Sequence, residues 1–137
     1  MTTIEDLKSE ARQAFWDEYF SNDPEGAIGI VESDQPHDYI SECADSSVPV
    51  WNADVMELGA EPEVYGHKNE LPPAYDGSPT PYNCLVTAIY EIIEADLWEF
   101  WDVIKMKYEE ILRDFGEINP GEIVRRMGEE LVARWNL

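Results

Sequence analysis

The sequence predicts a mainly α fold: a compact helical domain with one long central helix and a long proline-rich loop. Three observations lead to this prediction. Apolar residues recur at helical spacing along most of the chain, and residues that begin or end helices flank these stretches. The 137 residues have the size of one ordinary domain, and with 44% hydrophobic and 12% aromatic residues they can bury a core. We therefore expect residues 1–137 to form a single domain.

The first predicted helix begins at Thr3, which suits an N-cap, with Glu5 and Asp6 in the first turn, where the helix dipole favours acids. Its apolar stripe consists of Ile4, Leu7, Ala11, Ala14, Phe15 and Tyr19. The run 22–24 (Asn-Asp-Pro) is expected to end this helix. The next residues, 26–33, fit either a short helix or an extended link.

Two shorter helices and a long loop are predicted next. Asp34 and Pro36 open the second helix, which ends in the run 46–49. Pro49 begins a third helix that is expected to end at Gly59. The apolar residues of this third helix are Val50, Trp51, Val55, Met56 and Leu58. Residues 61–81 contain five prolines and two glycines, which predicts a loop. This loop is expected to pack on the helices through Val64, Tyr65, Leu71 and Tyr75.

The longest predicted helix begins at Pro81 or Tyr82 and runs to about Phe115, just before Gly116. Apolar residues occupy more than one of its faces, so this helix is expected to be central or shared with a second subunit. They are Leu85, Ala88, Ile89, Ile92, Ile93, Trp98, Trp101, Ile104, Tyr108, Ile111 and Leu112. Asn119 and Pro120 begin a last helix, at about 119–136.

The formal net charge of −21 is unusual for a chain that can bury a core, because like charges repel one another in the folded state. Residues 13–104 contain 20 acidic residues and a single basic one, Lys68, which gives this body of the chain a net charge of −19. Residues 105–137 contain seven acidic and six basic residues, a net charge of −1. The acidity therefore belongs to the folded body. It predicts a partner with a basic surface, and no binding to nucleic acid or to membranes.

Many of the acidic residues are spaced so that they share a helix face. Asp34, Asp38, Glu42 and Asp45 follow i, i+4, i+8, i+11 spacing. Residues four apart on a helix lie about 6 Å apart along its axis. Phosphates of a DNA strand repeat at roughly 3.4 Å of axial rise and lie farther apart through space because the strand winds, so the two spacings are comparable. Acidic residues on helices can therefore present negative charge at a spacing comparable with a phosphate strand, which makes them candidates for an acidic surface that imitates DNA. Its further members are Asp17, Glu18, Asp54, Glu57, Glu91, Glu94, Asp96, Glu99 and Asp102. A solvated acidic face is the alternative interpretation of any single run.

The sequence argues against catalysis and against a metal or cofactor. No nucleophile motif, phosphate-binding loop or calcium-loop motif is present. The residues His37, Cys43, His67 and Cys84 lack the compact spacing of a zinc site. We expect a protein that is no enzyme and needs no cofactor. The first nine residues lack the apolar run of a signal peptide, and no stretch reaches the roughly 18–20 apolar residues of a membrane span, so we expect a cytoplasmic protein.

Two ordered motifs are more specific than the charge. Residues 37–54 read H-D-x-I-x-x-x-A-D-x-x-V-P-x-x-x-A-D, and residues 89–99 read I-Y-E-x-x-x-x-D-L-W-E. Over about residues 36–112 the chain resembles the Ocr (overcome classical restriction) family of phage anti-restriction proteins, in both motifs and in the distance between them. It departs from the family at the C-terminus, where Arg113, Arg125, Arg126 and Arg134 stand in place of a very acidic tail.

This resemblance implies an all-helical homodimer, shaped like bent B-DNA, that blocks the DNA-binding groove of a type I restriction-modification enzyme in the host cell cytoplasm. It assigns the DNA-like carboxylates to Asp38, Asp45, Asp54, Glu91, Asp96 and Glu99. It assigns the dimer interface to Ala53, Val55, Met56 and Gly59. Such an inhibitor competes with DNA for lysines and arginines, so it breaks no bond.

Two alternatives stay open at this point. An excess of acidic residues with few lysines also fits an unrelated halophilic helical protein, although the balanced charge of the C-terminal helix argues against it. An acidic inhibitor of another DNA-binding protein also fits, because a BREX component, a CRISPR effector, RNA polymerase and a nucleoid protein all offer basic grooves.

Overall fold

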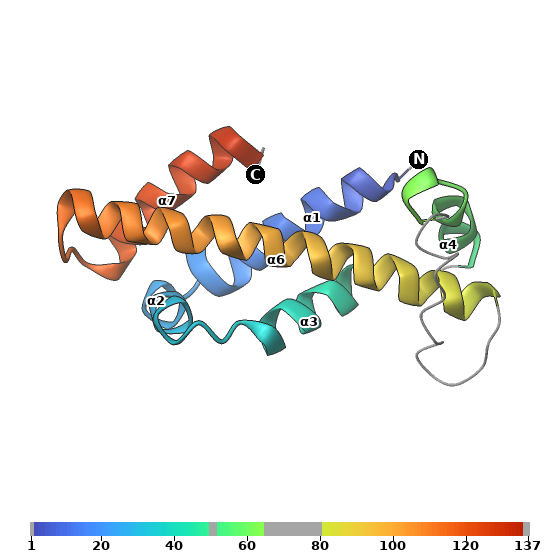
Figure 1. The fold of residues 1–137 in the computed structure, drawn as a ribbon, viewed down its shortest axis with the longest axis horizontal. Coiled ribbons are helices and arrows are strands. Elements are labelled where there is room, and N and C mark those ends of the chain that lie inside the picture. The colour runs from blue at the N-terminus through green and yellow to red at the C-terminus, as the bar shows by residue number, and fades with distance from the viewer. Residues whose placement is uncertain (1, 50–51, 65–80, 136–137) are drawn as a thin grey trace.

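The computed structural model describes residues 2–49, 52–64 and 81–135, and within these ranges the chain is helical and has no strand. The mainly α fold predicted from the sequence is confirmed. The elements, in chain order, are α1 (Ile4–Trp16), the π-helical turn η1 (Asp17–Ser21), α2 (Pro24–Ser33), α3 (His37–Ser47), α4 (Asn52–Gly59), α6 (Pro81–Phe115) and α7 (Pro120–Trp135). Helix α6 runs along the length of the molecule, and the other helices lie along or across it (Figure 1).

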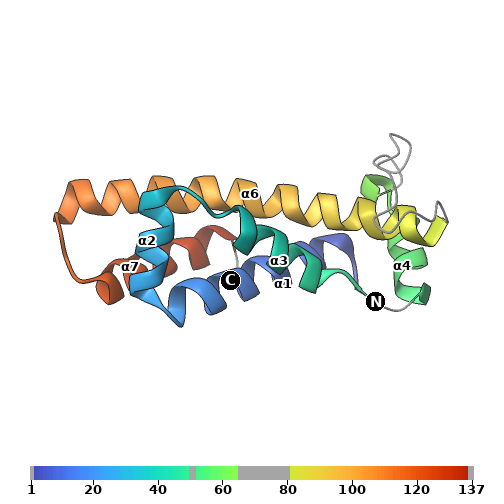
Figure 2. The ribbon, with the colours of Figure 1, turned by 90° about the horizontal axis from the view of Figure 1, so that it is seen from below.

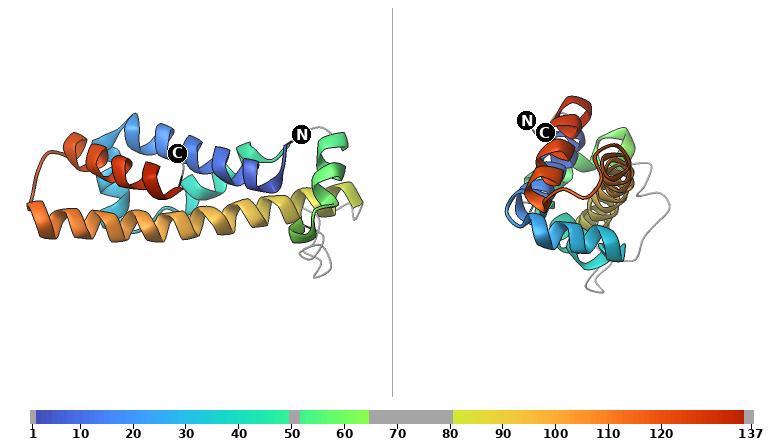
Figure 3. Two further views of the ribbon diagram at one scale, coloured as in Figure 1. Left: turned by 90° about the horizontal axis from the view of Figure 1, so that it is seen from above. Right: turned by 90° about the vertical axis from the view of Figure 1, so that its left-hand side faces the viewer.

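Helix α6 is the central helix that the sequence predicts, because α1, α3, α4 and α7 all pack against it. Figure 2 shows α3 beside one half of α6, while α2 crosses near the other half. Helices α1 and α7 lie along the same side of α6 (Figure 3). This arrangement leaves one stripe of α6 exposed, at Ala95, Glu99, Asp102, Met106, Glu109 and Arg113.

Helix ends follow from local sequence signals. The Thr3 hydroxyl accepts a hydrogen bond from the backbone N–H of Asp6 at 3.1 Å, and the Asp6 carboxylate accepts one from the Thr3 N–H at 2.9 Å, a capping box. The Asp23 carboxylate accepts from the Gly26 N–H at 3.2 Å, with Pro24 in the first turn, so the ambiguous segment 26–33 is helical. Gly116 ends α6 with a φ of 71°, a left-handed conformation that suits glycine.

One predicted helix boundary is wrong. Asp34 lies outside α3, because it ends α2 in a left-handed conformation with a φ of 52°, and α3 begins three residues later at His37. The predicted acidic row on this helix therefore shortens by one member.

Part of the proline-rich segment can be placed. Val64 is fully buried, as the packing of this segment predicts. The other three residues expected to anchor the loop, Tyr65, Leu71 and Tyr75, lie outside the described residues, as do Val50 and Trp51.

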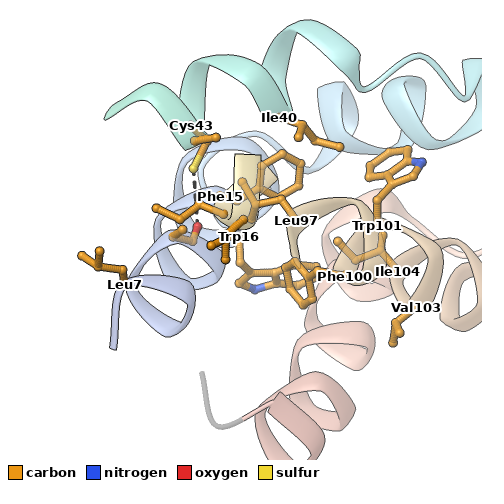
Figure 4. Packing of buried hydrophobic residues seen from close by; sticks show 14 of the residues in the cluster. Leu7, Phe15, Trp16, Ile40, Cys43, Leu97, Phe100, Trp101, Val103 and Ile104 are labelled. Carbon is orange, nitrogen blue, oxygen red and sulfur yellow. Dashed lines mark hydrogen bonds between the residues drawn. The ribbon is translucent and has the colours of Figure 1, made fainter. Parts of the chain in front are cut away.

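Aromatic rings form much of the core between α1, η1 and α6 (Figure 4). The ring of Phe15 contacts those of Phe100 and Trp101 edge to face, with centroids 6.4 Å apart in both pairs, and Trp16 stacks on Phe20 at 4.7 Å. All five side chains are buried. Such contacts are directional and add to the gain from burial. The acidic residues outside this core are thus carried by a packed scaffold.

Candidate functional site: an acidic surface

The acidic row of α3 is exposed as predicted. Ile40, Cys43 and Ala44 of this helix face the core. Asp38, Glu42 and Asp45 therefore point outward on the opposite side, and all three are exposed. None of the three forms an ion pair with a described lysine or arginine, and the His37 ring lies 3.9 Å from the Asp38 carboxylate. This row is uncompensated negative charge on one helix face.

The turn η1 brings a further carboxylate beside this row. The pKa of Tyr19 is raised to about 12, mainly by burial and in smaller part by the nearby carboxylates of Glu18 and Glu42. Both carboxylates also help to raise the pKa of Cys43 to about 11, after burial, which is the larger cause. Glu18 and Glu42 therefore lie close to the same two side chains, although they are distant in the sequence. Asp17 is exposed next to Glu18, and the side-chain amide of Gln13 donates to it.

Helix α6 contributes acidic residues to the surface in two ways. Glu94 is half-buried at the contact with α3, where it accepts hydrogen bonds from the Tyr90 hydroxyl at 2.6 Å and the Ser41 hydroxyl at 3.4 Å. Glu91, one turn earlier, is also half-buried. Glu99 and Asp102 instead lie on the exposed stripe, and Asp102 lies 3.9 Å from the amino group of Lys105. The sequence assigned all four residues to the acidic surface, but their surroundings differ.

A second acidic group lies where α4 meets α1. Asp54 and Glu57 of α4 are exposed. They line one small groove together with Glu10, above the apolar side chains of Leu7 and Leu58. This places the acidic residues of the predicted third helix on the surface, at the end of the molecule that α4 occupies in Figure 1.

Asp96 does not belong to the surface, and this part of the prediction is wrong. Only 8% of Asp96 is exposed, and its carboxylate lies 3.6 Å from the guanidinium of Arg12 on α1. Burial raises the pKa of Asp96, and the attraction of Arg12 only partly opposes this shift. Asp96 is thus a core residue that joins α6 to α1. The reason is the position of α1, which the spacing along α6 does not reveal.

Asp34 is exposed, but a nearby positive charge balances its carboxylate. Its carboxylate accepts hydrogen bonds from the indole N–H of Trp101 at 3.0 Å and from the amino group of Lys105 at 3.3 Å. These two bonds lower the pKa of Asp34, with the Trp101 bond as the larger cause. Asp34 therefore anchors the end of α2 to α6 and adds little to the uncompensated charge.

The predicted dimer interface divides into two parts. Val55 is fully buried, and Gly59 is buried against α6, where an added Cβ would lie 2.7 Å from the methyl groups of Leu85. These two residues pack inside the chain, which corrects their assignment to an interface. Ala53 and Met56 are exposed, so they alone of the four are open to a second copy.

Most basic residues at the end of α6 and on α7 form ion pairs there, away from the acidic row. Lys107 pairs with Glu110 and Glu130, and Arg126 pairs with Glu122. Arg125 pairs with Glu122 and Glu129, and its hydrogen bond to Glu122 is the main reason why the pKa of that carboxyl falls to about 2. Helix α7 and the end of α6 are therefore balanced within themselves, as the sequence charges suggest.

One exposed aromatic residue was not predicted to belong to the surface. Tyr39 is 37% exposed, and its ring contacts that of Tyr19. Helical spacing does not reveal this exposure, because Tyr39 lies one turn before the buried Cys43 on the same side of α3.

These features define a class: a helical protein with one uncompensated acidic face on a packed aromatic core. No family model, no curated protein and no solved structure matches the chain. Among the described residues, no group of three or more His, Cys, Asp or Glu side chains is arranged to hold a metal ion. No described helix combines the length and the apolar character that crossing a membrane requires.

Proposed function

We propose that this protein is a DNA-mimic inhibitor that occupies the DNA-binding groove of a host defence enzyme, with a type I restriction-modification enzyme as the first target. The observation that carries the proposal is the set of exposed carboxylates at Glu18, Asp38, Glu42 and Asp45, which have no lysine or arginine partner among the described residues. The two motifs shared with the Ocr family support the same function.

The mechanism is electrostatic competition. A DNA-binding groove gains much of its affinity from lysines and arginines that replace counterions along the phosphates. Carboxylates held on packed helices attract the same groove at long range and then contact the same side chains. Because the acidic helices are already folded, binding avoids much of the ordering cost, and no DNA has to be bent.

The proposal includes a homodimer that acts in the cytoplasm of the host cell. The exposed residues Ala53 and Met56 of α4 are the remaining candidates for the interface. A dimer joined there would place two acidic bodies end to end, since α4 lies at one end of α6 (Figure 1). Such a pair would present a longer acidic surface than one chain.

The test is inhibition of DNA cleavage and DNA binding by a type I restriction-modification enzyme, with two matched triple variants. The first, Asp38→Asn/Glu42→Gln/Asp45→Asn, removes three charges from the acidic row. The second, Glu109→Gln/Asp114→Asn/Glu117→Gln, removes three charges from exposed positions near the end of α6. The first variant should weaken inhibition at least about tenfold, because each lost contact with a basic groove lowers affinity. The second should stay within about twofold, since its residues lie outside the acidic row.

The two variants distinguish the effect of where the negative charges lie from the effect of the total negative charge. Equal weakening by both variants would mean that net charge alone matters, and the mimicry account would fail. Failure of the unchanged protein to inhibit at large excess would remove this target. The same pair of variants would then be applied to the other DNA-binding proteins with basic grooves, namely BREX components, CRISPR effectors, RNA polymerase and nucleoid proteins.

A further inference from the structure

A groove between α2 and α3 borders the acidic row. It is lined by Gly26, Gly29, Ile30 and Ser33 of α2, by Gln35 between the two helices, and by Asp38 and Tyr39 of α3. No lysine, arginine or histidine lines it. Asp38 is also the first member of the acidic row, and its side chain is fully exposed. The groove therefore brings the Tyr39 ring and the Ile30 side chain together with a carboxylate in a lining that is mostly polar.

One of the residues that line this groove is a glycine that no neighbouring atom requires. Glycine in a helix interior is less stable than alanine. Gly26 has a reason within the chain, because a Cβ there would lie 2.3 Å from the Asp23 carboxylate that caps α2. Gly29 has none: a Cβ there would meet nothing within 4 Å, and the residue is exposed. Its missing side chain keeps the groove open.

The aromatic wall is held in place. The ring of Tyr39 contacts the ring of Tyr19 edge to face, with centroids 5.1 Å apart and planes at 72°. Tyr19 is itself packed against the fully buried Phe15, at 5.3 Å. The exposed ring of Tyr39 is therefore fixed to the core through two ring contacts. It presents a preformed aromatic surface next to the Asp38 carboxylate.

The chemistry of these walls selects one kind of side chain. A guanidinium group is planar, stacks on aromatic rings and pairs with a carboxylate through two parallel hydrogen bonds. Its methylene stem would lie against Ile30, while an ammonium group is more strongly hydrated and stacks less well. The charge is complementary, since residues 13–104 carry a net charge of −19.

We infer that the groove between α2 and α3 binds an arginine side chain from the basic groove of the inhibited enzyme. Tyr39 supplies the stacking surface, Asp38 supplies the carboxylate, and Gly29 leaves the space. This inference rests on the proposed function, because that function supplies a partner rich in arginine and lysine. The inference goes beyond the proposed function because it names one kind of side chain and the place where it binds. Charge mimicry in general would treat arginine and lysine alike.

The first test uses two probes of equal charge, the peptides hexa-arginine and hexa-lysine, added to the full chain and followed by NMR. Hexa-arginine should move the Gly29 amide and Tyr39 ring signals and should bind about fivefold tighter than hexa-lysine, the ratio expected from one added cation–π contact. Equal affinity for the two peptides, with these signals unmoved, would overturn the inference.

Variants test whether the preference for hexa-arginine depends on the groove between α2 and α3. Gly29→Leu fills the groove, and Tyr39→Ala removes the stacking ring; both should abolish the preference for hexa-arginine while hexa-lysine binds as before. Gly121→Leu is the matched control on α7, because that glycine is also helical and exposed and lies outside the groove. Gly29→Ala should raise the melting temperature and yet weaken hexa-arginine binding. A preference that survives Gly29→Leu would overturn the inference.

The restriction assay separates this inference from the proposed function. Gly29→Leu should weaken inhibition several-fold, and Gly121→Leu should leave it unchanged. If Gly29→Leu inhibits as well as the unchanged protein, the arginine subsite is wrong and the mimic function stands. If the unchanged protein does not inhibit but prefers hexa-arginine, the proposed target fails and the arginine site stands.

Discussion

Asp96 and Arg12 form a buried ion pair that joins three helices. The Arg12 guanidinium also lies over the ring of Trp135 on α7, 4.8 Å from its centroid. Arg12 Nε, Asp96 Oδ2 and Trp135 Nε1 are buried and lack a hydrogen-bond partner among the described residues. Burying charges costs free energy that their attraction only partly returns. The pair therefore specifies how α1, α6 and α7 fit together more than it adds stability.

Removal of the Arg12 guanidinium should reveal the free-energy cost of burying the Asp96 carboxylate. Arg12→Met leaves the Asp96 carboxylate buried and alone, which should lower the free energy of unfolding at neutral pH by about 3–5 kcal/mol, measured in urea. Arg125→Met is the control, and its loss should be much smaller because the ion pairs of Arg125 are exposed. Equal losses for the two variants would contradict a special role for the buried pair.

The raised pKa of Asp96 also predicts a pH dependence. The folded state holds the Asp96 proton more tightly than the unfolded chain does, so protonation stabilises the fold. This contribution is fully present below the ordinary value of 3.8 and is lost as the pH rises through the raised pKa. Arg12→Met should therefore recover stability on acidification more steeply than the unchanged protein. In Asp96→Asn this part of the pH dependence should disappear.

Cys43 should be an unreactive thiol. It is buried, it donates a weak hydrogen bond to the Ala11 carbonyl at 3.4 Å, and its pKa is raised to about 11, mainly by burial. Since the thiolate is the reactive form, iodoacetamide at pH 8 should modify Cys43 only after unfolding in urea. Peptide mass spectrometry measures this directly. Rapid labelling of Cys43 in the native protein would contradict the packing of α3 on α1.

Helix α4 is attached to α6 by a close contact. Gly59 lies against the side chain of Leu85, which is 2% exposed and has little space to move. Gly59→Ala should therefore lower the free energy of unfolding by about 1–3 kcal/mol through overpacking. Gly29→Ala is a suitable control, because no atom lies within 4 Å of its added Cβ. A stabilising effect of Gly59→Ala would show that α4 can shift without cost.

The outer face of α4 tests the dimer separately. Met56 is 47% exposed, so Met56→Glu should change the free energy of unfolding by no more than about 0.5 kcal/mol. If α4 forms the interface, this variant should be a monomer in light scattering while the unchanged chain is a dimer. An unchanged molar mass would remove α4 from the interface. Stability and association are thus read from different measurements.

At the scale of the whole molecule, a charge of −21 predicts that folding and the proposed inhibition respond to salt in opposite directions. Added salt screens repulsion among the carboxylates, so the melting temperature should rise between about 0.01 and 0.5 M NaCl. Salt also weakens contacts with a basic groove, so inhibition should decrease over the same range. A chain that is unfolded at 0.01 M NaCl would instead support the halophilic alternative.

The sequence by itself determined the helices and the charge. Helix ends depend on local signals such as the capping box at Thr3 and the glycine at 116, and these need no knowledge of distant residues. The sequence also located the excess of acidic residues in residues 13–104, because charge is a property of composition. The row of Asp38, Glu42 and Asp45 was predictable because a single exposed face of α3 contains all three.

The tertiary structure alone decided which acidic residues remain free. Helical spacing tells which residues share a face, but it does not tell what covers that face. Helix α6 is covered by α1 and α7 on one side and contacts α3 on another, so Asp96 is buried, Glu94 is hydrogen-bonded and Glu99 is exposed within six residues. Burial, and with it the pKa of each carboxyl, depends on contacts between distant segments, and those exist only once the chain has folded.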